Sequence, residues 1–159
     1  MICLSSRSVA ELLSRSCNAE MATTVFDSTS IPTISLHDYL DRLKRALSMT
    51  DAQVWLAVHY IDRYLKTSGP TVSLSSMHRL LGTALVLAQK FDSDIGYPER
   101  VYAKAVGVTV RELMGLQMVF MRQIDFRLMY PSEQEEVTAT EALKLGPALR
   151  PRVEAALDV

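Results

Sequence analysis

Apolar residues along this chain recur at helical spacing, and the intervals between the apolar segments are polar or contain glycine and proline. Between Leu36 and Leu47, leucine and tyrosine return every three or four residues, which predicts a helix with one buried stripe, capped by Ser35. Two longer segments, 51–67 and 75–92, are apolar on nearly every side. A helix of that kind is buried, so the other helices must pack around these two.

Capping residues and helix breakers set the remaining boundaries. Thr50 or Asp51 opens the helix over 51–67, and Thr109 and Glu112 have the spacing of a capping box. Gly107 is placed to end a short helix in a left-handed conformation. The further predicted helices cover residues 8–20, 99–106, 110–125 and 132–145.

The predicted fold class is all-α, because no segment shows the alternating pattern of a strand. Five helices form the core, and one further helix flanks it at each end. Residues 1–33 form the N-terminal helix and a Ser/Thr-rich linker, residues 34–130 the five-helix core, and residues 131–159 a C-terminal helix and a loose tail.

Composition indicates a single globular domain inside the cell. The 159 residues are 48% hydrophobic and 22% charged, and the net charge of −1 gives no general attraction to nucleic acid or an anionic membrane. No apolar run approaches the length of a membrane span, and residues 1–20 lack the apolar core of a secretory signal. Cys3 and Cys17 have no zinc-site spacing, so we interpret them as reduced thiols of a nuclear or cytoplasmic protein.

The sequence offers no constellation for catalysis or for a metal. Each histidine lies on a different predicted helix, at His37, His59 and His78. His59 and Asp62 are one turn apart, but no third ligand or nucleophile is spaced to join them. Glycine-rich phosphate loops and the nucleophile elbow are also absent from the sequence. We therefore predict that the chain is not an enzyme and needs no cofactor.

Three charged residues on apolar helices invite a structural interpretation. If the two helices that carry Arg42 and Asp62 pack antiparallel, these residues can meet as a partly buried pair that fixes the helix register. The alternative is two unrelated surface charges. Lys90 lies in the last turn of an apolar helix, where a lysine stabilises free carbonyl groups and complements the helix dipole.

Several motifs resemble one known family. The strings LAVHYIDRYL over 56–65 and LLGTALVLAQKF over 80–91 are similar to the second and third helices of a cyclin box. The strings ISLHDYLDRL, HRLL, YAKAVGV and REL, at 34–43, 78–81, 102–108 and 111–113, resemble the P-type cyclins, which are also called phosphate-pathway-like or U-type. The resemblance covers about residues 9–131, and the five helices inferred from periodicity equal the five of a cyclin box.

The resemblance implies a regulatory subunit that binds and activates a cyclin-dependent protein kinase. Cyclins press the ends of their third and fifth helices against a regulatory helix of the kinase. Lys90 matches the family's lysine that bonds to kinase backbone carbonyls, and Phe91 would pack beside it. Asp94 matches an acidic position near the kinase activation segment. The alternative is a cyclin-fold scaffold, or a transcription-factor-like binding module, without a kinase partner.

One position departs from the family pattern. Gln117 stands where the family has the glutamate that partners the lysine. We expect Lys90 to lack an internal counter-charge as a result, and Gln117→Glu to strengthen kinase binding. The neighbouring Met118 and Met121 offer adaptable contact area, although packing in the core is the commoner role of such methionines.

Overall fold

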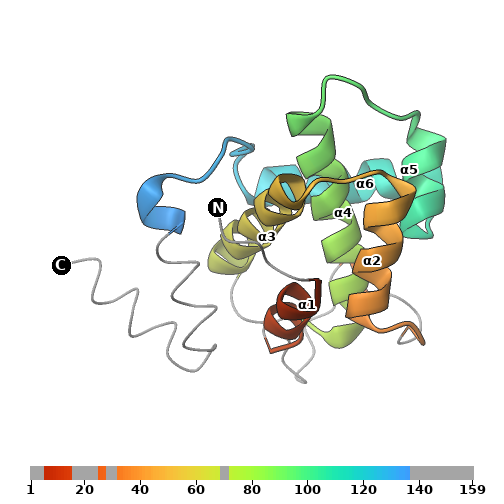
Figure 1. Ribbon diagram of the computed structural model, residues 1–159, viewed down its shortest axis with the longest axis horizontal. Coiled ribbons are helices and arrows are strands. Elements are labelled where there is room, and N and C mark those ends of the chain that lie inside the picture. Colours follow the sequence, from red (N-terminus) through yellow and green to blue (C-terminus); the bar gives the residue numbers. More distant parts are fainter. Residues whose placement is uncertain (1–5, 16–24, 28–31, 69–71, 137–159) are drawn as a thin grey trace.

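The computed structural model describes residues 6–15, 25–27, 32–68 and 72–136, and within these ranges all regular secondary structure is helical. A helical turn at 133–136 follows the last of the six assigned helices (Figure 1). The six are α1 (Ser6–Arg15), α2 (Leu36–Ala46), α3 (Asp51–Ser68), α4 (Leu74–Asp92), α5 (Glu99–Val106) and α6 (Val110–Gln123). The all-α prediction is confirmed.

The predicted caps form. The Ser35 hydroxyl accepts the backbone N–H of the third residue of α2, as an N-cap does. Thr50 rather than Asp51 caps α3, because its hydroxyl accepts the Gln53 amide and the Gln53 side chain accepts the Thr50 amide. Both bonds of the capping box at the start of α6 are present, and Gly107 ends α5 at a φ of 88°.

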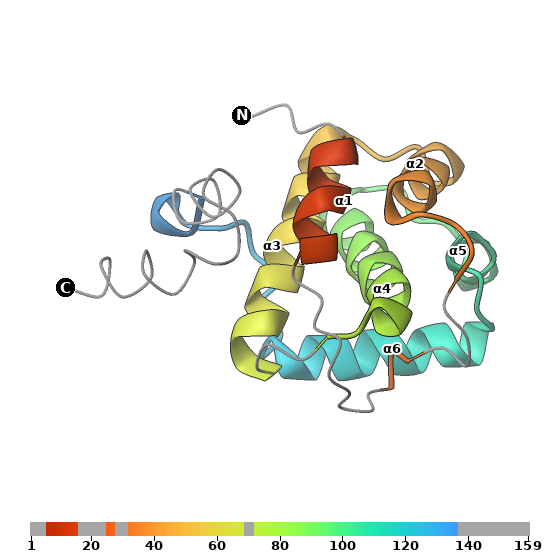
Figure 2. The same ribbon diagram turned by 90° about the horizontal axis from the view of Figure 1, so that it is seen from below.

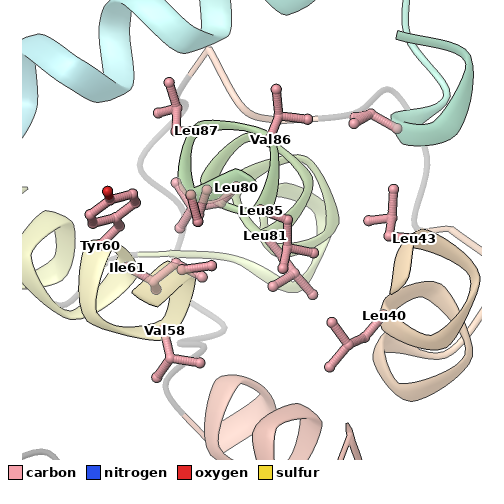
Figure 3. Close-up of a cluster of buried hydrophobic side chains, with 14 of the residues drawn as sticks. Leu40, Leu43, Val58, Tyr60, Ile61, Leu80, Leu81, Leu85, Val86 and Leu87 are labelled. Atoms are coloured by element: carbon pink, nitrogen blue, oxygen red, sulfur yellow. The ribbon is translucent and has the colours of Figure 1, made fainter. Parts of the chain in front are cut away.

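Helix α4 is the centre of the fold. Figure 2 shows it running obliquely through the middle of the molecule, with α2, α3, α5 and α6 around it. Every residue from Leu80 to Gln89 is buried, which agrees with the apolar pattern of this segment on all sides. Leucines of α2 and the apolar side of α3 converge on it (Figure 3). Each fully buried aliphatic side chain contributes about 1.5–3 kcal/mol, so α4 anchors the domain.

Gly82 allows α2 and α5 to approach α4 closely. A Cβ atom at this position would lie 2.6 Å from the Tyr39 hydroxyl and 2.9 Å from a methyl group of Val106. That hydroxyl donates a hydrogen bond of 2.9 Å to the Val106 carbonyl, so α2 holds the end of α5. Burial raises the pKa of Tyr39, and its hydroxyl remains a donor.

The predicted pair of Arg42 and Asp62 is wrong. Arg42 instead donates to the Ala105 carbonyl at 3.1 Å, and Asp62 pairs with Lys66 at 3.0 Å within α3. The reason is topological: α2 packs on α1, α4 and α5, so the helices that carry the two charges are not the close antiparallel neighbours that the pair requires.

The two ends of the chain are described only in part. Helix α1 begins two residues earlier than predicted, and residues 16–20 of the predicted helix lie outside the described residues. The predicted C-terminal helix is present over 133–136, and its remainder and the predicted tail also lie outside. The domain boundaries at 33 and 130 stay a prediction.

Candidate interaction surface around Lys90

Lys90 lies where α4, α5 and α6 meet. Its ammonium group forms an ion pair with the Glu99 carboxylate in the first turn of α5. It donates to the Gln117 amide oxygen of α6 at 2.8 Å, and the nitrogen lies 5.1 Å from the centre of the Tyr102 ring. The side chain is 31% exposed. Three helices therefore hold one cation whose side chain remains partly exposed.

Gln117 is buried and its amide orientation is fixed. Its nitrogen donates to the Leu113 carbonyl and to Glu99, both at 3.3 Å, so its oxygen faces Lys90. The resemblance placed position 117 beside the lysine, and the contact exists. The expectation that Lys90 lacks an internal counter-charge is wrong, because Glu99 supplies a carboxylate from another helix.

The arrangement leaves one hydrogen-bond donor of Lys90 without a partner in the described part of the chain. An ammonium group has three N–H donors, and Glu99 and Gln117 accept two of them. The remaining donor, on a partly exposed side chain, is available to a carbonyl oxygen of another molecule. The two partners fix the head in place, which reduces the conformational entropy that such a contact would cost.

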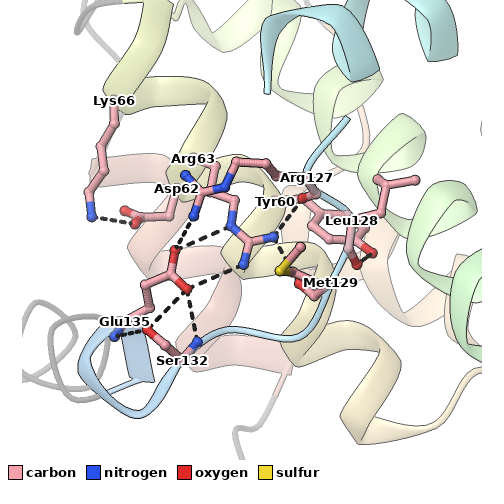
Figure 4. A network of polar contacts seen from close by, with 9 residues as sticks. All are labelled: Tyr60, Asp62, Arg63, Lys66, Arg127, Leu128, Met129, Ser132 and Glu135. Carbon is pink, nitrogen blue, oxygen red and sulfur yellow. Dashed lines mark hydrogen bonds and ion pairs between the residues drawn. The ribbon is translucent and has the colours of Figure 1, made fainter. Parts of the chain in front are cut away.

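Arg63 of α3 is a buried cation to which sequence reasoning assigned no partner. Arg63 donates from Nη1 to the carbonyls of Arg127 and Met129, at 2.7 and 3.0 Å. Its other nitrogens reach the Glu135 carboxylate at 3.4–3.5 Å (Figure 4). The guanidinium carbon lies 5.9 Å from the centre of the Tyr60 ring. Arg63 thus fastens the segment after α6 to the core.

Glu135 serves this network and also caps the final described turn. Its carboxylate accepts the Ser132 amide at 2.9 Å, and its own amide donates to the Ser132 hydroxyl. Burial raises the pKa of Glu135, but the Ser132 amide and the Arg63 guanidinium outweigh burial and bring it below its usual value. The carboxylate is therefore ionised where it meets Arg63.

His59 lies one turn before Arg63 and is buried without a partner for its Nε2 atom. The edge of its ring packs against Trp55, with ring centres 4.6 Å apart. Burial, with a further contribution from the charge of Arg63, lowers its pKa to about 4. The imidazole is neutral at physiological pH, and the structure shows a packed core histidine.

Comparison with known proteins decides the family. The family model named Cyclin matches residues 4–128, most of the chain. The chain belongs to the cyclin family.

Plant and fungal proteins are among the relatives of this cyclin. It is 33% identical to Cyclin-U2-1 of Arabidopsis thaliana over 119 residues, which are 74% of this chain and 54% of that protein. It is 34% identical to Cyclin-P2-1 of Oryza sativa subspecies japonica over 103 residues, 65% and 48% of the two chains. Against the Nuc-1 negative regulatory protein preg of Neurospora crassa, identity is 35% over 106 residues, 66% and 22% of the two chains. The chain thus spans about half the length of the plant proteins.

These findings confirm the resemblance to P- and U-type cyclins, a family of non-catalytic regulatory subunits. In the described part of this cyclin, no group of three acidic, histidine or cysteine side chains is arranged to hold a metal ion. Over the same residues, no helix combines the length and the apolar character that crossing a bilayer requires.

Of the other residues predicted for kinase binding, Phe91 and Asp94 lie at and just after the end of α4, and Met121 lies on α6. Phe91 is 46% exposed and meets Tyr130 edge to face, with ring centres 6.0 Å apart. Asp94 is exposed in the loop after α4. Met121 packs in part against the core of this cyclin, whereas Met118 is 42% exposed. Met118 is therefore better placed than Met121 to contact a partner.

Sequence reasoning missed Glu99, and it noted Arg63 on an apolar helix without assigning it a partner. Glu99 follows Pro98 at the start of a predicted helix, where an acidic residue is explained by the helix dipole alone. Arg63 offered a stronger signal, because an arginine within an apolar helix needs partners for several donors. Those partners lie more than sixty residues away, so their identity required the fold.

Proposed function

We propose that this cyclin binds and activates a cyclin-dependent protein kinase through the surface around Lys90. The observation that carries the proposal is an ammonium group held by Glu99 and Gln117 with a donor to spare. Exposed Phe91 follows Lys90 in the sequence and exposed Met118 follows Gln117, and both offer apolar area of the kind found in protein interfaces. Membership of the cyclin family supports the choice of partner.

Activation would follow from binding to one conformation of the kinase. A protein kinase requires an ion pair between a lysine and a glutamate of its regulatory helix, and a partner that holds this helix in place selects the active state. In the proposed complex, Lys90 donates to backbone carbonyls beside that helix, and Phe91 and Met118 pack against it. The exposed carboxylate of Asp94 would pair with an arginine near the activation segment.

In this role the chain supplies no catalytic group and requires no cofactor, nucleic acid or membrane. The kinase performs the phosphoryl transfer, in the nucleus or the cytoplasm. The resemblance to phosphate-pathway-like cyclins makes phosphate signalling the first pathway to test, and the cell cycle the second. Measurement of kinase activity in extracts from phosphate-fed and phosphate-starved cells that carry the tagged chain would distinguish them.

The proposal is tested by capture of a kinase from the source cells with three tagged forms of the chain. Wild type should retain a cyclin-dependent kinase and raise its activity toward a peptide substrate. Lys90→Ala should weaken the affinity for the purified kinase by about 2–5 kcal/mol, because it removes a charged donor from a desolvated contact. Lys66→Ala, which alters an exposed lysine of α3, is the matched control and should bind like wild type.

Two outcomes would contradict the proposal, one for the location of the interface and the other for the class of partner. Equal kinase affinity for wild type and Lys90→Ala would show that the interface lies elsewhere on the molecule. Failure of folded, helical wild type to retain any kinase would favour the alternative, a cyclin-fold module with another kind of partner.

A further inference from the structure

A groove lined by cationic and apolar side chains lies between α2 and α5, away from the Lys90 contacts. Its volume is about 720 Å³. The lining residues are Arg42, Ala46, Arg100, Val101, Lys104 and Ala105. Three of these six side chains carry a positive charge, the other three are apolar, and none of the lining residues is acidic.

The groove and the Lys90 surface use different faces of α5. Successive residues of a helix are separated by about 100°, so Arg100 and Lys104 share one face, four residues apart. Glu99 and Tyr102, which contact Lys90, lie on the other side of the same helix. A kinase bound at Lys90 would therefore leave the groove free, and an occupant of the groove does not depend on the proposed function.

The cations of the groove are available to a ligand. Arg42 is fixed, because it donates to the Ala105 carbonyl at 3.1 Å and its guanidinium carbon lies 5.1 Å from the centre of the Tyr39 ring. That bond uses one of its five donors. Among the residues that the structure describes, Arg100 and Lys104 have no ion-pair partner, and both are exposed.

We propose that this groove binds a phosphorylated segment of a partner protein. A phosphoryl group carries nearly two negative charges at neutral pH and accepts paired hydrogen bonds from the planar fork of an arginine. Three cations around one groove match that charge better than they match a single carboxylate. The apolar lining residues Ala46, Val101 and Ala105 would contact a small apolar side chain next to the phosphorylated residue.

Such a site would give the regulatory subunit a contact of its own with phosphoproteins. A phosphorylated protein held on α2 and α5 stays near whatever is bound at Lys90, which raises its effective concentration there. Binding would be salt-dependent, because the three charged residues that line the groove are exposed.

The test uses the full chain and an immobilised library of degenerate peptides with a central phosphoserine or phosphothreonine. The same library without phosphate is the reference. The phosphorylated library should retain the chain and the reference should not. The peptide with the highest affinity, made also with serine and with aspartate at the centre, then gives affinities by fluorescence anisotropy.

Two double variants locate the site. Arg100→Gln with Lys104→Gln should weaken binding of the phosphopeptide on the order of tenfold, because two charged donors are lost. Lys66→Gln with Arg122→Gln removes the same charge from α3 and α6 and should change affinity by less than about twofold. Arg42 stays unaltered, because it also holds the end of α5. Circular dichroism confirms that each variant is folded.

The proposal is overturned by equal retention on the two libraries, or by an unchanged affinity of the Arg100 and Lys104 variant. Equal binding of the aspartate peptide would also overturn it and would identify an acidic segment as the occupant. None of these results bears on kinase binding at Lys90, because no kinase is present in the assay.

Discussion

Arg63 and Lys90 are both basic residues in the C-terminal half of an apolar helix, and they serve different purposes. The Arg63 side chain is 8% exposed, and its Nε, Nη1 and Nη2 atoms all donate to partners within the chain. The Lys90 side chain is 31% exposed and has two partners for three donors. A cation with its nitrogens engaged holds the fold together, whereas one with a spare donor at the surface can recognise another molecule.

Side-chain chemistry accounts for the division. The guanidinium group of Arg63 is a planar fork, and two backbone carbonyls and a carboxylate around it match that geometry. The ammonium group of Lys90 is a compact charge on a flexible stem, which can turn toward a carbonyl that arrives from outside. An exchange of the two residue types would therefore impair both regions.

The largest effect is expected for Arg63→Ala. The change leaves the carbonyls of Arg127 and Met129 without the donor from Arg63 and removes the buried cation that pairs with Glu135, so the free energy of unfolding should fall by about 3–5 kcal/mol. Urea unfolding followed by circular dichroism measures the loss. Arg127→Ala is the matched control, because Arg127 also contacts Glu135 but is 55% exposed, and should cost less than about 1 kcal/mol.

If Arg63→Ala and Arg127→Ala lower the free energy of unfolding by similar amounts, the comparison fails. That result would show that the burial of Arg63 and its hydrogen bonds to carbonyls add no stability. Arg63→Lys gives a further check. A lysine keeps the charge but lacks the fork, so it should recover only part of the stability.

The second prediction concerns Lys90→Ala measured for stability rather than for binding. Its ion pair and hydrogen bond lie at the surface, so the free energy of unfolding should fall by less than about 1 kcal/mol. The same variant is expected to lose about 2–5 kcal/mol of kinase affinity. If Lys90→Ala lowers the free energy of unfolding as much as Arg63→Ala does, Lys90 has a structural role, and the two residues do not differ in the way argued above.

The third prediction uses pH to separate the two regions. The pKa of His59 falls from 6.5 to about 4 on folding, so the unfolded chain binds a proton first as the solution is acidified. Stability should therefore decline as pH falls from about 6.5 toward 4, by about 2 kcal/mol between pH 7 and 5. Lowering of the pKa of Glu135 acts in the same direction at lower pH, because the folded state favours the ionised carboxylate.

Urea unfolding at pH 7 and pH 5 measures this decline in wild type and in His59→Leu, which cannot titrate. The decline should shrink in His59→Leu and persist in His37→Ala, which alters an exposed histidine on α2. An undiminished decline in His59→Leu would show that His59 does not carry the pH dependence.

The helices and their caps could be predicted because they depend on neighbouring residues. A Ser or Thr at an N-cap, a glutamate three positions later and a glycine at the end of a helix act within one or two turns. Thr109 and Glu112 form the capping box that their spacing indicates, and Gly107 adopts the left-handed conformation. The apolar pattern of 75–92 likewise predicted the buried central helix, since burial on all sides needs an apolar residue on all sides.

The pairing of side chains between helices could not be predicted with the same rules. Glu99 meets Lys90 because the loop after α4 returns the chain beside that helix, and Arg42 meets α5 because α2 packs there and not on α3. In both cases the sequence showed the charged residue but not its partner. The partner depends on which helices are adjacent, and the packing of the whole core decides that. The resemblance supplied one such pairing, that of Lys90 with position 117. Members of a family share a fold, so contacts between helices can be inferred from the family pattern.

The smallest effects on kinase affinity are expected for variants that add, remove or relocate the carboxylate beside Lys90. Gln117→Glu was expected to restore a missing counter-charge, but Glu99 already provides one, so the single variant would place two carboxylates beside one ammonium group. We now expect it to change kinase affinity by less than about 1 kcal/mol. Glu99→Gln alone should weaken the affinity by a similar amount, because Lys90 loses the ion pair that orients it.

The double variant Glu99→Gln with Gln117→Glu keeps one carboxylate and one amide but exchanges their helices. If the net charge around Lys90 is what orients it, the double variant should bind the kinase like wild type, within about 0.5 kcal/mol. Competition binding at low and moderate salt measures the differences. A double variant weaker than either single change would show that the Gln117 amide is required on α6, where it also bonds to the Leu113 carbonyl, and that the carboxylate cannot replace it.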